Sequence, residues 1–349
     1  MRNHPRISLL YIAGSVLTLC MLLPPSADAR KHYRPWLKYQ PPPTARLALP
    51  PGQVLALPAG LPKTCAIRRP AKLSLDEATP LASWLVRSMQ PQVCADLNRL
   101  LASTKRGPAT FDADGTLWAG DVGEGFFLWM LRNRHYPADR IPSLQRAWQS
   151  YKSGQLASES MYELMVTSMA GMREADVQQL ATRYFEKRHS SRIYTPMQTL
   201  VTTLAATGFS PWIVSGSPRW VVEAGARHFG IPQNHVIGLS VRVDEDGRLT
   251  DQIIRPVPWK EGKADRILQQ LGRRPVIAAG NSQGDAYMLK IASELPLVIN
   301  PARDFQRTAQ QRGWPINTFT PADELARIIR PRPSADTLVT DLVHSLSAL

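Results

Sequence analysis

The sequence predicts an α/β fold, in which a parallel sheet is covered by helices on both faces. Between residues 195 and 300, short apolar runs alternate with segments of helical periodicity, and this alternation is typical of parallel sheets. Polar clusters follow several of the apolar runs, where ligand sites of such sheets form. Residues 121–189 contain helical segments but no convincing strand. We therefore expect a helical cap inserted after the first strand.

The first 29 residues predict a signal peptide. Arg2 and Arg6 flank a weakly polar start, Ile7 to Leu23 is an almost uninterrupted apolar run, and Ala27-Asp28-Ala29 fits a cleavage site. We expect a cut before Arg30 and a periplasmic or secreted protein. The alternative is an uncleaved anchor in the inner membrane that faces the periplasm, because the apolar run approaches the length of a membrane span.

Export would remove Cys20 and leave Cys65 and Cys94. Two cysteines in an oxidising compartment favour one disulfide, and two reduced, buried cysteines are the alternative. Neither cysteine has histidine or cysteine neighbours at the spacing of metal ligands, so we do not expect zinc.

The chain is strongly basic, with 42 lysines and arginines against 28 aspartates and glutamates. This balance suits anionic partners. The arginines are scattered, and no basic helix or basic patch with interleaved aromatic residues occurs, so nucleic acid is not expected. The charge favours small anionic substrates or the cell envelope. Membrane contact is expected only through the N-terminal segment if it stays uncleaved, and the oligomeric state cannot be predicted.

Residues 30–63 are rich in proline and predict a linker or an irregular wrap. Residues 64–106 predict two helices, within 73–89 and 91–103. The catalytic core is expected over 107–120 and 190–330, with a C-terminal tail over 331–349.

Within the core, a short strand at 109–111 leads into the first polar cluster. After the cap, a hairpin is expected over 236–255, turning at Asp246-Gly247. The other expected elements are helices over 195–208, 218–230, 263–272, 285–293 and 322–330, and strands over 211–217, 275–280 and 296–300.

Four polar clusters lie at the expected strand ends: FDADGT at 111–116, SGS at 215–217, the lysine pair Lys260 and Lys263, and GNSQGD at 280–285. Since the carboxyl ends of parallel strands meet at one edge of a sheet, these clusters should lie together. Asp112 and Asp114 repel each other unless a cation lies between them, so the site predicts Mg²⁺.

In order and chemistry, these clusters resemble the haloacid dehalogenase-like superfamily, specifically its phosphoserine-phosphatase-like branch, over about residues 107–330. The resemblance implies a Rossmann-like core and an Mg²⁺-dependent phosphomonoesterase that hydrolyses a small phosphorylated metabolite. The segment from the expected hairpin to residue 289 also resembles bacterial secreted phosphorylcholine phosphatases. Phosphocholine or a phosphoserine-like compound is therefore the expected substrate.

The resemblance also implies roles for individual residues. Asp112 would be the nucleophile that forms an aspartyl-phosphate, and Asp114 the general acid and base. Ser215 would donate its hydroxyl to a phosphoryl oxygen, together with backbone N–H groups such as that of Gly216. Lys263, which opens a helix after a glycine, matches the family's lysine better than Lys260 does.

The metal ligands implied by the resemblance are Asp112, the backbone carbonyl of Asp114, Asp285 and Asn281. The family usually has an aspartate where this chain has Asn281, and we expect weaker metal binding because an amide carries no charge. This departure leaves an alternative of a different class: a catalytically weak protein that binds a phosphorylated ligand or the anionic envelope.

Four further residues are candidates for substrate contact. Thr116 could bond the loop or the phosphate. Asp121 could contact a substrate ammonium group, as in phosphoserine phosphatases, or cap the following helix. Trp118 and Trp259 adjoin the motifs and could offer aromatic faces to a quaternary ammonium group. A helical cap would enclose a small substrate and exclude water.

Overall fold

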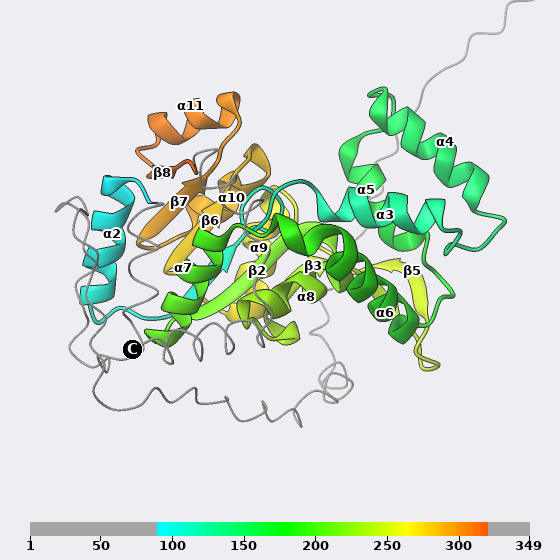
Figure 1. Cartoon of the computed structure of the whole chain (residues 1–349), viewed down its shortest axis with the longest axis horizontal. Coiled ribbons are helices and arrows are strands. Elements are labelled where there is room, and N and C mark those ends of the chain that lie inside the picture. The colour runs from blue at the N-terminus through cyan, green and yellow to red at the C-terminus, as the bar shows by residue number, and fades with distance from the viewer. Residues whose placement is uncertain (1–88, 320–349) are drawn as a thin grey trace, which may run out of the picture. The chain divides into compact units, whose positions relative to one another are not determined.

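The computed structural model describes residues 89–319 and has a six-stranded parallel sheet at its centre (Figure 1). The strand order is β3-β2-β1-β6-β7-β8, and every pairing between neighbours is parallel. The strands are β1 (Pro108–Phe111), β2 (Ser210–Pro218), β3 (Val236–Leu239), β6 (Ile277–Gly280), β7 (Leu295–Ile299) and β8 (Ile316–Asn317). The predicted α/β fold is confirmed.

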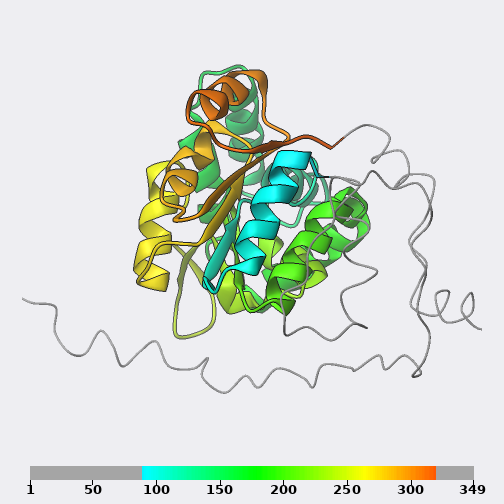
Figure 2. The same cartoon turned by 90° about the vertical axis from the view of Figure 1, so that its left-hand side faces the viewer.

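Helices cover both faces of this sheet, and Figure 2 shows α9 and α10 on one side of the strands and α2 and α7 on the other. The α-helices are α2 (Pro91–Ala102), α3 (Val122–Arg132), α4 (Ile141–Lys152), α5 (Ser158–Thr167), α6 (Glu174–Tyr184), α7 (Thr195–Ala206), α8 (Arg219–Ala226), α9 (Glu261–Leu271), α10 (Ala286–Lys290) and α11 (Arg303–Gln311). A π-helical turn, Phe185–His189, continues α6, and short 3₁₀ turns lie at Ser190–Arg192, Arg227–Phe229, Gln233–His235 and Gln283–Asp285.

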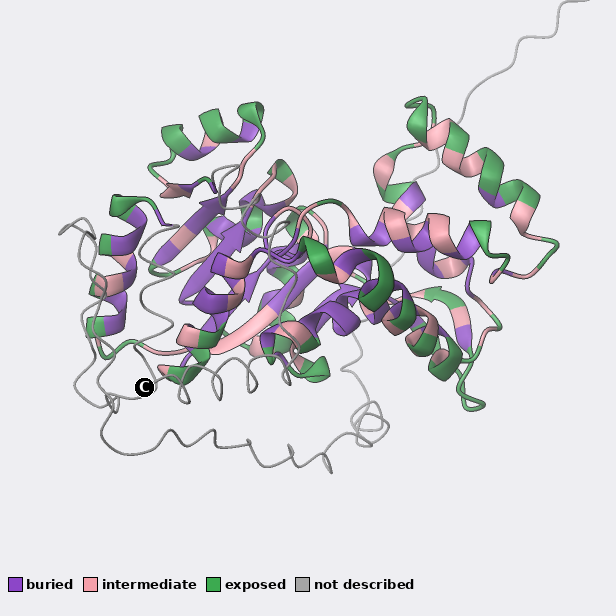
Figure 3. Ribbon diagram, in the orientation of Figure 1, coloured by how far each residue is buried: buried purple, intermediate pink, exposed green. Residues whose placement is uncertain are grey.

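Every residue of β1, β3 and β6 is buried, whereas β2 begins with residues of intermediate burial (Figure 3). Burial on both faces explains the continuous apolar runs of these strands. Successive side chains of a strand point to opposite faces. Ile277 and Ala279 of β6 therefore join the core cluster that includes α2, α7 and α8, whereas Ala278 joins the cluster beneath α9, α10 and α11. The sheet is thus the shared wall of two apolar layers.

The four helices α3–α6 fill the predicted insert and gather at one end of the part of the chain that the structure describes (Figure 1). The two segments that connect this insert to the core run side by side. The amide of Ala119 donates to the carbonyl of Arg192 at 2.9 Å, and the amide of Tyr194 donates to that of Leu117 at 2.9 Å. The insert therefore leaves and rejoins the core at the same place.

The expected hairpin over 236–255 is wrong in its first part. Val236–Leu239 is β3, an outer strand of the main sheet that pairs in parallel with β2. The hairpin itself consists of β4 (Val241–Val243) and β5 (Leu249–Ile253), which pair in antiparallel fashion around the expected turn. All four residues of β3 are buried, and a short run buried on both faces carries no alternation that would separate the two settings.

The helix α11 and the strand β8 were not predicted. Only Phe305 and Ala309 of α11 are buried, so too few apolar residues mark this polar helix in the sequence, and β8 has only two residues.

Several expectations lie outside the described residues: the signal peptide, the proline-rich segment, the helix within 73–89, the helix within 322–330 and the tail. Cys94 is disulfide-bonded, and the only other cysteines of the chain, Cys20 and Cys65, lie outside the described residues. Across residues 89–319, every helix is too short or too polar to cross a bilayer.

Candidate active site

The first polar cluster follows β1 at the carboxyl edge of the sheet. The amide of Asp112 donates to the carbonyl of Ala279 at 2.8 Å, so the ladder between β1 and β6 continues into the cluster. The chain then turns at Gly115, whose φ is +77°. A side chain at this position would collide with the amide group of Asn281. The glycine therefore lets the first and fourth clusters touch.

Lys263 joins two of the predicted carboxylates. Its side chain is buried, and its Nζ lies 2.5 Å from Asp112 Oδ1 and 2.6 Å from Asp285 Oδ1. Lys260, by contrast, lies 4.1 Å above the ring of Trp259. Lys263, rather than Lys260, therefore forms ion pairs with the carboxylates.

Asp285 is held by the loop that precedes it. Its Oδ2 accepts hydrogen bonds from the amide of Asn281 at 2.9 Å, from the amide of Ser282 at 3.0 Å and from the Ser282 hydroxyl at 3.1 Å. Its Oδ1 is therefore the oxygen that faces Lys263.

Asp114 accepts hydrogen bonds on both carboxylate oxygens. Oδ1 accepts from the indole N–H of Trp118 and from the amide of Val122, each at 2.7 Å. Oδ2 accepts from the Ser217 hydroxyl at 2.6 Å. The expectation that Trp118 contacts substrate is corrected here, because its ring is fully buried, packs on Phe185 and supports Asp114 from the core side.

A pocket of about 170 Å³ lies over these groups. The predicted residues Asp112, Asp114, Asp121, Ser215, Gly216, Trp259, Lys263, Asn281 and Asp285 all line it. Thr116 does not: it is fully buried, and its hydroxyl donates to Asp112 Oδ2 at 3.1 Å. Thr116 therefore bonds the loop, which is one of its two predicted roles.

Further residues that line the pocket had no site role assigned from the sequence. Tyr162 and Met165 come from α5 of the insert, Ser217 comes from the end of β2, and Ser282 comes from the loop after β6. The rings of Tyr162 and Trp259 meet edge to face, with centroids 5.8 Å apart. Ser217 stands two positions after Ser215 in the SGS cluster, and this nearness could have marked it as a candidate site residue. Nothing in the sequence marks Met165 except its place in a helix.

The carboxylates outnumber the cations in this pocket, and their pKa values reflect it. Burial, together with the charge of Asp285, raises the pKa of Asp112 to about 7 despite the opposing effect of Lys263. Burial and then the charges of Asp121 and Asp112 raise the pKa of Asp114 well above its usual range. Burial alone would lower the pKa of Lys263, but the two carboxylates raise it, so the lysine stays charged.

Asp121 caps a helix and also lines the pocket, and its contact with a substrate ammonium group stays a prediction. Its side chain caps α3 by accepting from the amide of Glu124 at 2.7 Å, and it also lines the pocket. Burial raises its pKa to about 6, although the bond from Glu124 opposes this shift.

The donor set suits a hard cation, because carboxylate and amide oxygens are what Mg²⁺ prefers. Within residues 89–319, no three His, Cys, Asp or Glu side chains are grouped so as to hold a metal ion by themselves. Asp112 and Asp285 would therefore need the main-chain carbonyl of Asp114 or the side chain of Asn281 as further ligands. The excess of buried acid in the pocket is consistent with such a cation.

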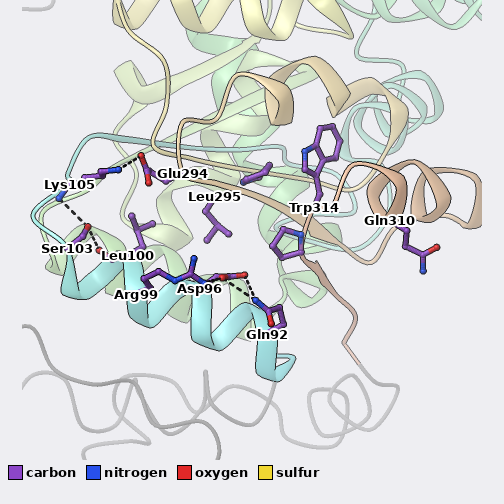
Figure 4. Close-up of a pocket in the computed structure, with 13 residues that line it drawn as sticks. Gln92, Asp96, Arg99, Leu100, Ser103, Lys105, Glu294, Leu295, Gln310 and Trp314 are labelled. Carbon is purple, nitrogen blue, oxygen red and sulfur yellow. Dashed lines mark hydrogen bonds and ion pairs between the residues drawn. The ribbon is translucent and has the colours of Figure 1, made fainter.

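A larger cavity of about 790 Å³ lies elsewhere, between α2 and the segment that carries β7 and Trp314 (Figure 4). Its charged side chains are paired with one another: Arg99 bonds Asp96, and Lys105 lies 2.7 Å from Glu294. It contains none of the four polar clusters, so the chemistry is concentrated in the smaller pocket.

Comparison with known proteins agrees with this geometry. The family model for haloacid dehalogenase-like hydrolases matches residues 109–290. A histidinol-phosphatase of Neisseria meningitidis is 22% identical over 60% of this chain and 98% of its own length. The phosphoserine phosphatase SerB1 of Mycobacterium tuberculosis is 24% identical over 63% of this chain and 73% of its own length.

Among solved structures, a protein of unknown function from Bordetella pertussis Tohama I superposes with a TM-score of 0.52 at 23% identity, covering 61% of this chain and 99% of that one. This likeness supports the fold.

Proposed function

Because this chain belongs to the family of haloacid dehalogenase-like hydrolases, we propose that it is a phosphomonoesterase that hydrolyses a small substrate through Asp112. The observation that carries the proposal is the buried contact of Lys263 with Asp112 and Asp285 at the base of the pocket. A nucleophilic carboxylate needs a neighbouring positive charge when a phosphoryl group approaches it.

The reaction has two halves. A carboxylate oxygen of Asp112 attacks phosphorus, and the bond to the leaving oxygen breaks while Asp114 supplies a proton. Water then attacks phosphorus, Asp114 takes the proton of that water, and the electrons of the broken bond return to Asp112. Lys263 orients Asp112 and offsets negative charge, and Ser215 lies where its hydroxyl can reach the phosphoryl oxygens. Bound Mg²⁺ would supply further positive charge against these oxygens.

For the substrate, we propose a small phosphomonoester that carries a positively charged amine. The acidic Asp121 lies in the same pocket as the paired rings of Tyr162 and Trp259, and an acid beside aromatic faces attracts a cation. The named relatives act on histidinol phosphate and phosphoserine, which both contain an amine. Phosphocholine carries a quaternary ammonium group in place of the amine, and the same aromatic pair would attract that cation.

An assay with added Mg²⁺ tests both parts of this proposal. Hydrolysis of 4-nitrophenyl phosphate should disappear on chelation and in Asp112→Asn; full activity in that variant would refute the mechanism. The substrate class is tested by comparing phosphocholine with its uncharged isostere 3,3-dimethylbutyl phosphate. The wild type should prefer the cation at least about tenfold, and Asp121→Asn should reduce the preference. Equal rates for both esters would refute the amine proposal.

Asn281 favours the alternative of a binding protein with feeble catalysis. Its uncharged amide lies against Gly115, where the family usually places a carboxylate. Under this alternative, the protein would bind phosphocholine in calorimetry while showing no turnover that depends on metal. Turnover in the assay above would exclude it.

We further propose that the protein is exported, on the sequence pattern of residues 1–29. N-terminal sequencing of protein recovered from a periplasmic fraction should begin at Arg30. An intact N-terminus in the membrane fraction would support the anchored alternative.

A further inference from the structure

We propose that Ser217 is a positioning residue for Asp114: its hydroxyl fixes the carboxylate so that Oδ2, and not Oδ1, gives and takes the proton during the reaction. This inference rests on the proposed function of Asp114 as general acid and base. Neither the sequence motifs nor the comparisons assign Ser217 a role.

Oδ1 of Asp114 is held by two donors. It accepts two hydrogen bonds of 2.7 Å, from the indole N–H of Trp118 and from the amide of Val122. Neither group can accept a proton in return. Trp118 and Val122 are also fully buried, so Oδ1 is on the core side. A proton on Oδ1 would break at least one of these bonds.

Oδ2 has a different partner. It accepts one hydrogen bond of 2.6 Å, from the Ser217 hydroxyl, and Asp114 and Ser217 both line the pocket. A hydroxyl is both a donor and an acceptor. It can donate to the ionised carboxylate and, after rotation, accept from the carboxylic acid.

The proton balance follows from this geometry. In the first half of the reaction, the proton on Oδ2 passes to the leaving oxygen as its bond to phosphorus breaks, and the Ser217 hydroxyl turns to donate to the new carboxylate. In the second half, the attacking water gives a proton to Oδ2 as the bond between phosphorus and Asp112 breaks. Ser217 then stops donating to Oδ2, and Asp114 is again an acid.

Gly123 leaves the room that Ser217 needs. A Cβ atom at residue 123 would lie 2.7 Å from the Ser217 hydroxyl and 3.0 Å from Pro218 Cδ, which is closer than van der Waals contact allows. Gly123 lies in the first turn of α3, where alanine is otherwise favoured. Gly123→Ala therefore displaces the Ser217 hydroxyl without removing it.

The test compares kcat/KM for two esters of similar size. Benzyl phosphate has an alkoxide leaving group that needs a proton, whereas the nitrophenolate of 4-nitrophenyl phosphate does not. In Ser217→Ala and in Gly123→Ala, kcat/KM for benzyl phosphate should fall at least about tenfold more than for 4-nitrophenyl phosphate, because acid catalysis is worth about 10²–10⁴-fold. Equal losses for both esters would overturn the proposal.

Two matched variants serve as controls. Ser282→Ala removes a hydroxyl that donates to Asp285 instead of Asp114. Gly125→Ala adds the same methyl group to α3 against the Tyr184 hydroxyl. Both can change the rate, but both should keep the wild-type ratio of the two esters. A changed ratio in either control would show that the ratio does not report on Ser217, and would overturn the proposal.

Crystal structures separate this proposal from the function on which it rests. In Ser217→Ala and Gly123→Ala, the Asp114 carboxylate should turn away from its wild-type orientation. An unchanged orientation overturns the positioning role whatever the activity. A wild-type protein that hydrolyses neither ester overturns the proposed function, while a turned carboxylate in the variants still supports the role of Ser217 in holding Asp114.

Discussion

Replacing Asp112 by asparagine should stabilise the metal-free protein above neutral pH while it removes the proposed nucleophile. The Asp112 side chain is buried, with 6% of its surface exposed, and its pKa is raised from 3.8 to about 7. Folding therefore favours its neutral form. The free energy of unfolding that is lost by burying the charged carboxylate is zero below the unfolded pKa of 3.8. This loss grows as the pH rises and is complete above about 7.

The magnitude follows from this difference. About three pH units between the two pKa values correspond to about 4 kcal/mol at about 1.36 kcal/mol for each unit. Asparagine has the shape of the carboxyl group without its charge, so Asp112→Asn should recover up to this amount near pH 8 and little near pH 4.

The assay is urea denaturation of both proteins in a chelating buffer, near pH 4 and near pH 8. The matched control is Asp251→Asn on β5, where the residue is exposed and the change should stay within about 0.5 kcal/mol. If Asp112→Asn is no more stable than the wild type near pH 8, then Lys263 fully compensates the charge of Asp112, and the reasoning is refuted.

Three further predictions concern stability. Lys263→Met should destabilise the protein by about 3–5 kcal/mol near pH 8, because it leaves two buried carboxylates without their cation, and denaturation should show a smaller loss near pH 4; equal losses would contradict this. Gly115→Ala should lower the free energy of unfolding by at least about 1 kcal/mol, because φ is +77° and Asn281 occupies the space; an unchanged melting curve would contradict it. Burial lowers the pKa of His189 from 6.5 to about 4, so charging this imidazole opposes folding. The wild type should lose up to about 3 kcal/mol relative to His189→Gln as the pH falls from about 6.5 to about 4; parallel pH profiles would contradict this.

Much of the fold could be predicted because its signals are local. Strands buried on both faces are continuous apolar runs, and the helices between them have a periodic apolar face. The grouping of Asp112, Ser215 and Asp285 was predictable too, because each follows or adjoins a strand end at the same edge of the sheet. Lys263 lies in α9 and does not follow a strand end of the main sheet, and only the resemblance to the family assigned it to the site. The structure places all four in one pocket.

The rest depends on contacts between distant segments. Trp118 adjoins the first motif, but only the packing of Phe185 and the direction of Asp114 show that its ring lies in the core. Ser217 reaches Asp114 across 103 positions of the chain, and no local pattern records that distance. For α11, the polar surface leaves only two buried residues as a signal.

The paired crossings between insert and core have a consequence for how such a protein can change over generations. The chain leaves the core near Ala119 and rejoins it near Arg192, and a hydrogen bond joins these two residues. The sheet can therefore keep its structure when the insert between them changes in length. Tyr162 and Met165 come from the insert. Asp112 comes from the sheet edge, and Lys263 comes from α9. Under the proposed function, substrate selectivity can therefore change through the insert while the proposed reacting groups of the core stay the same.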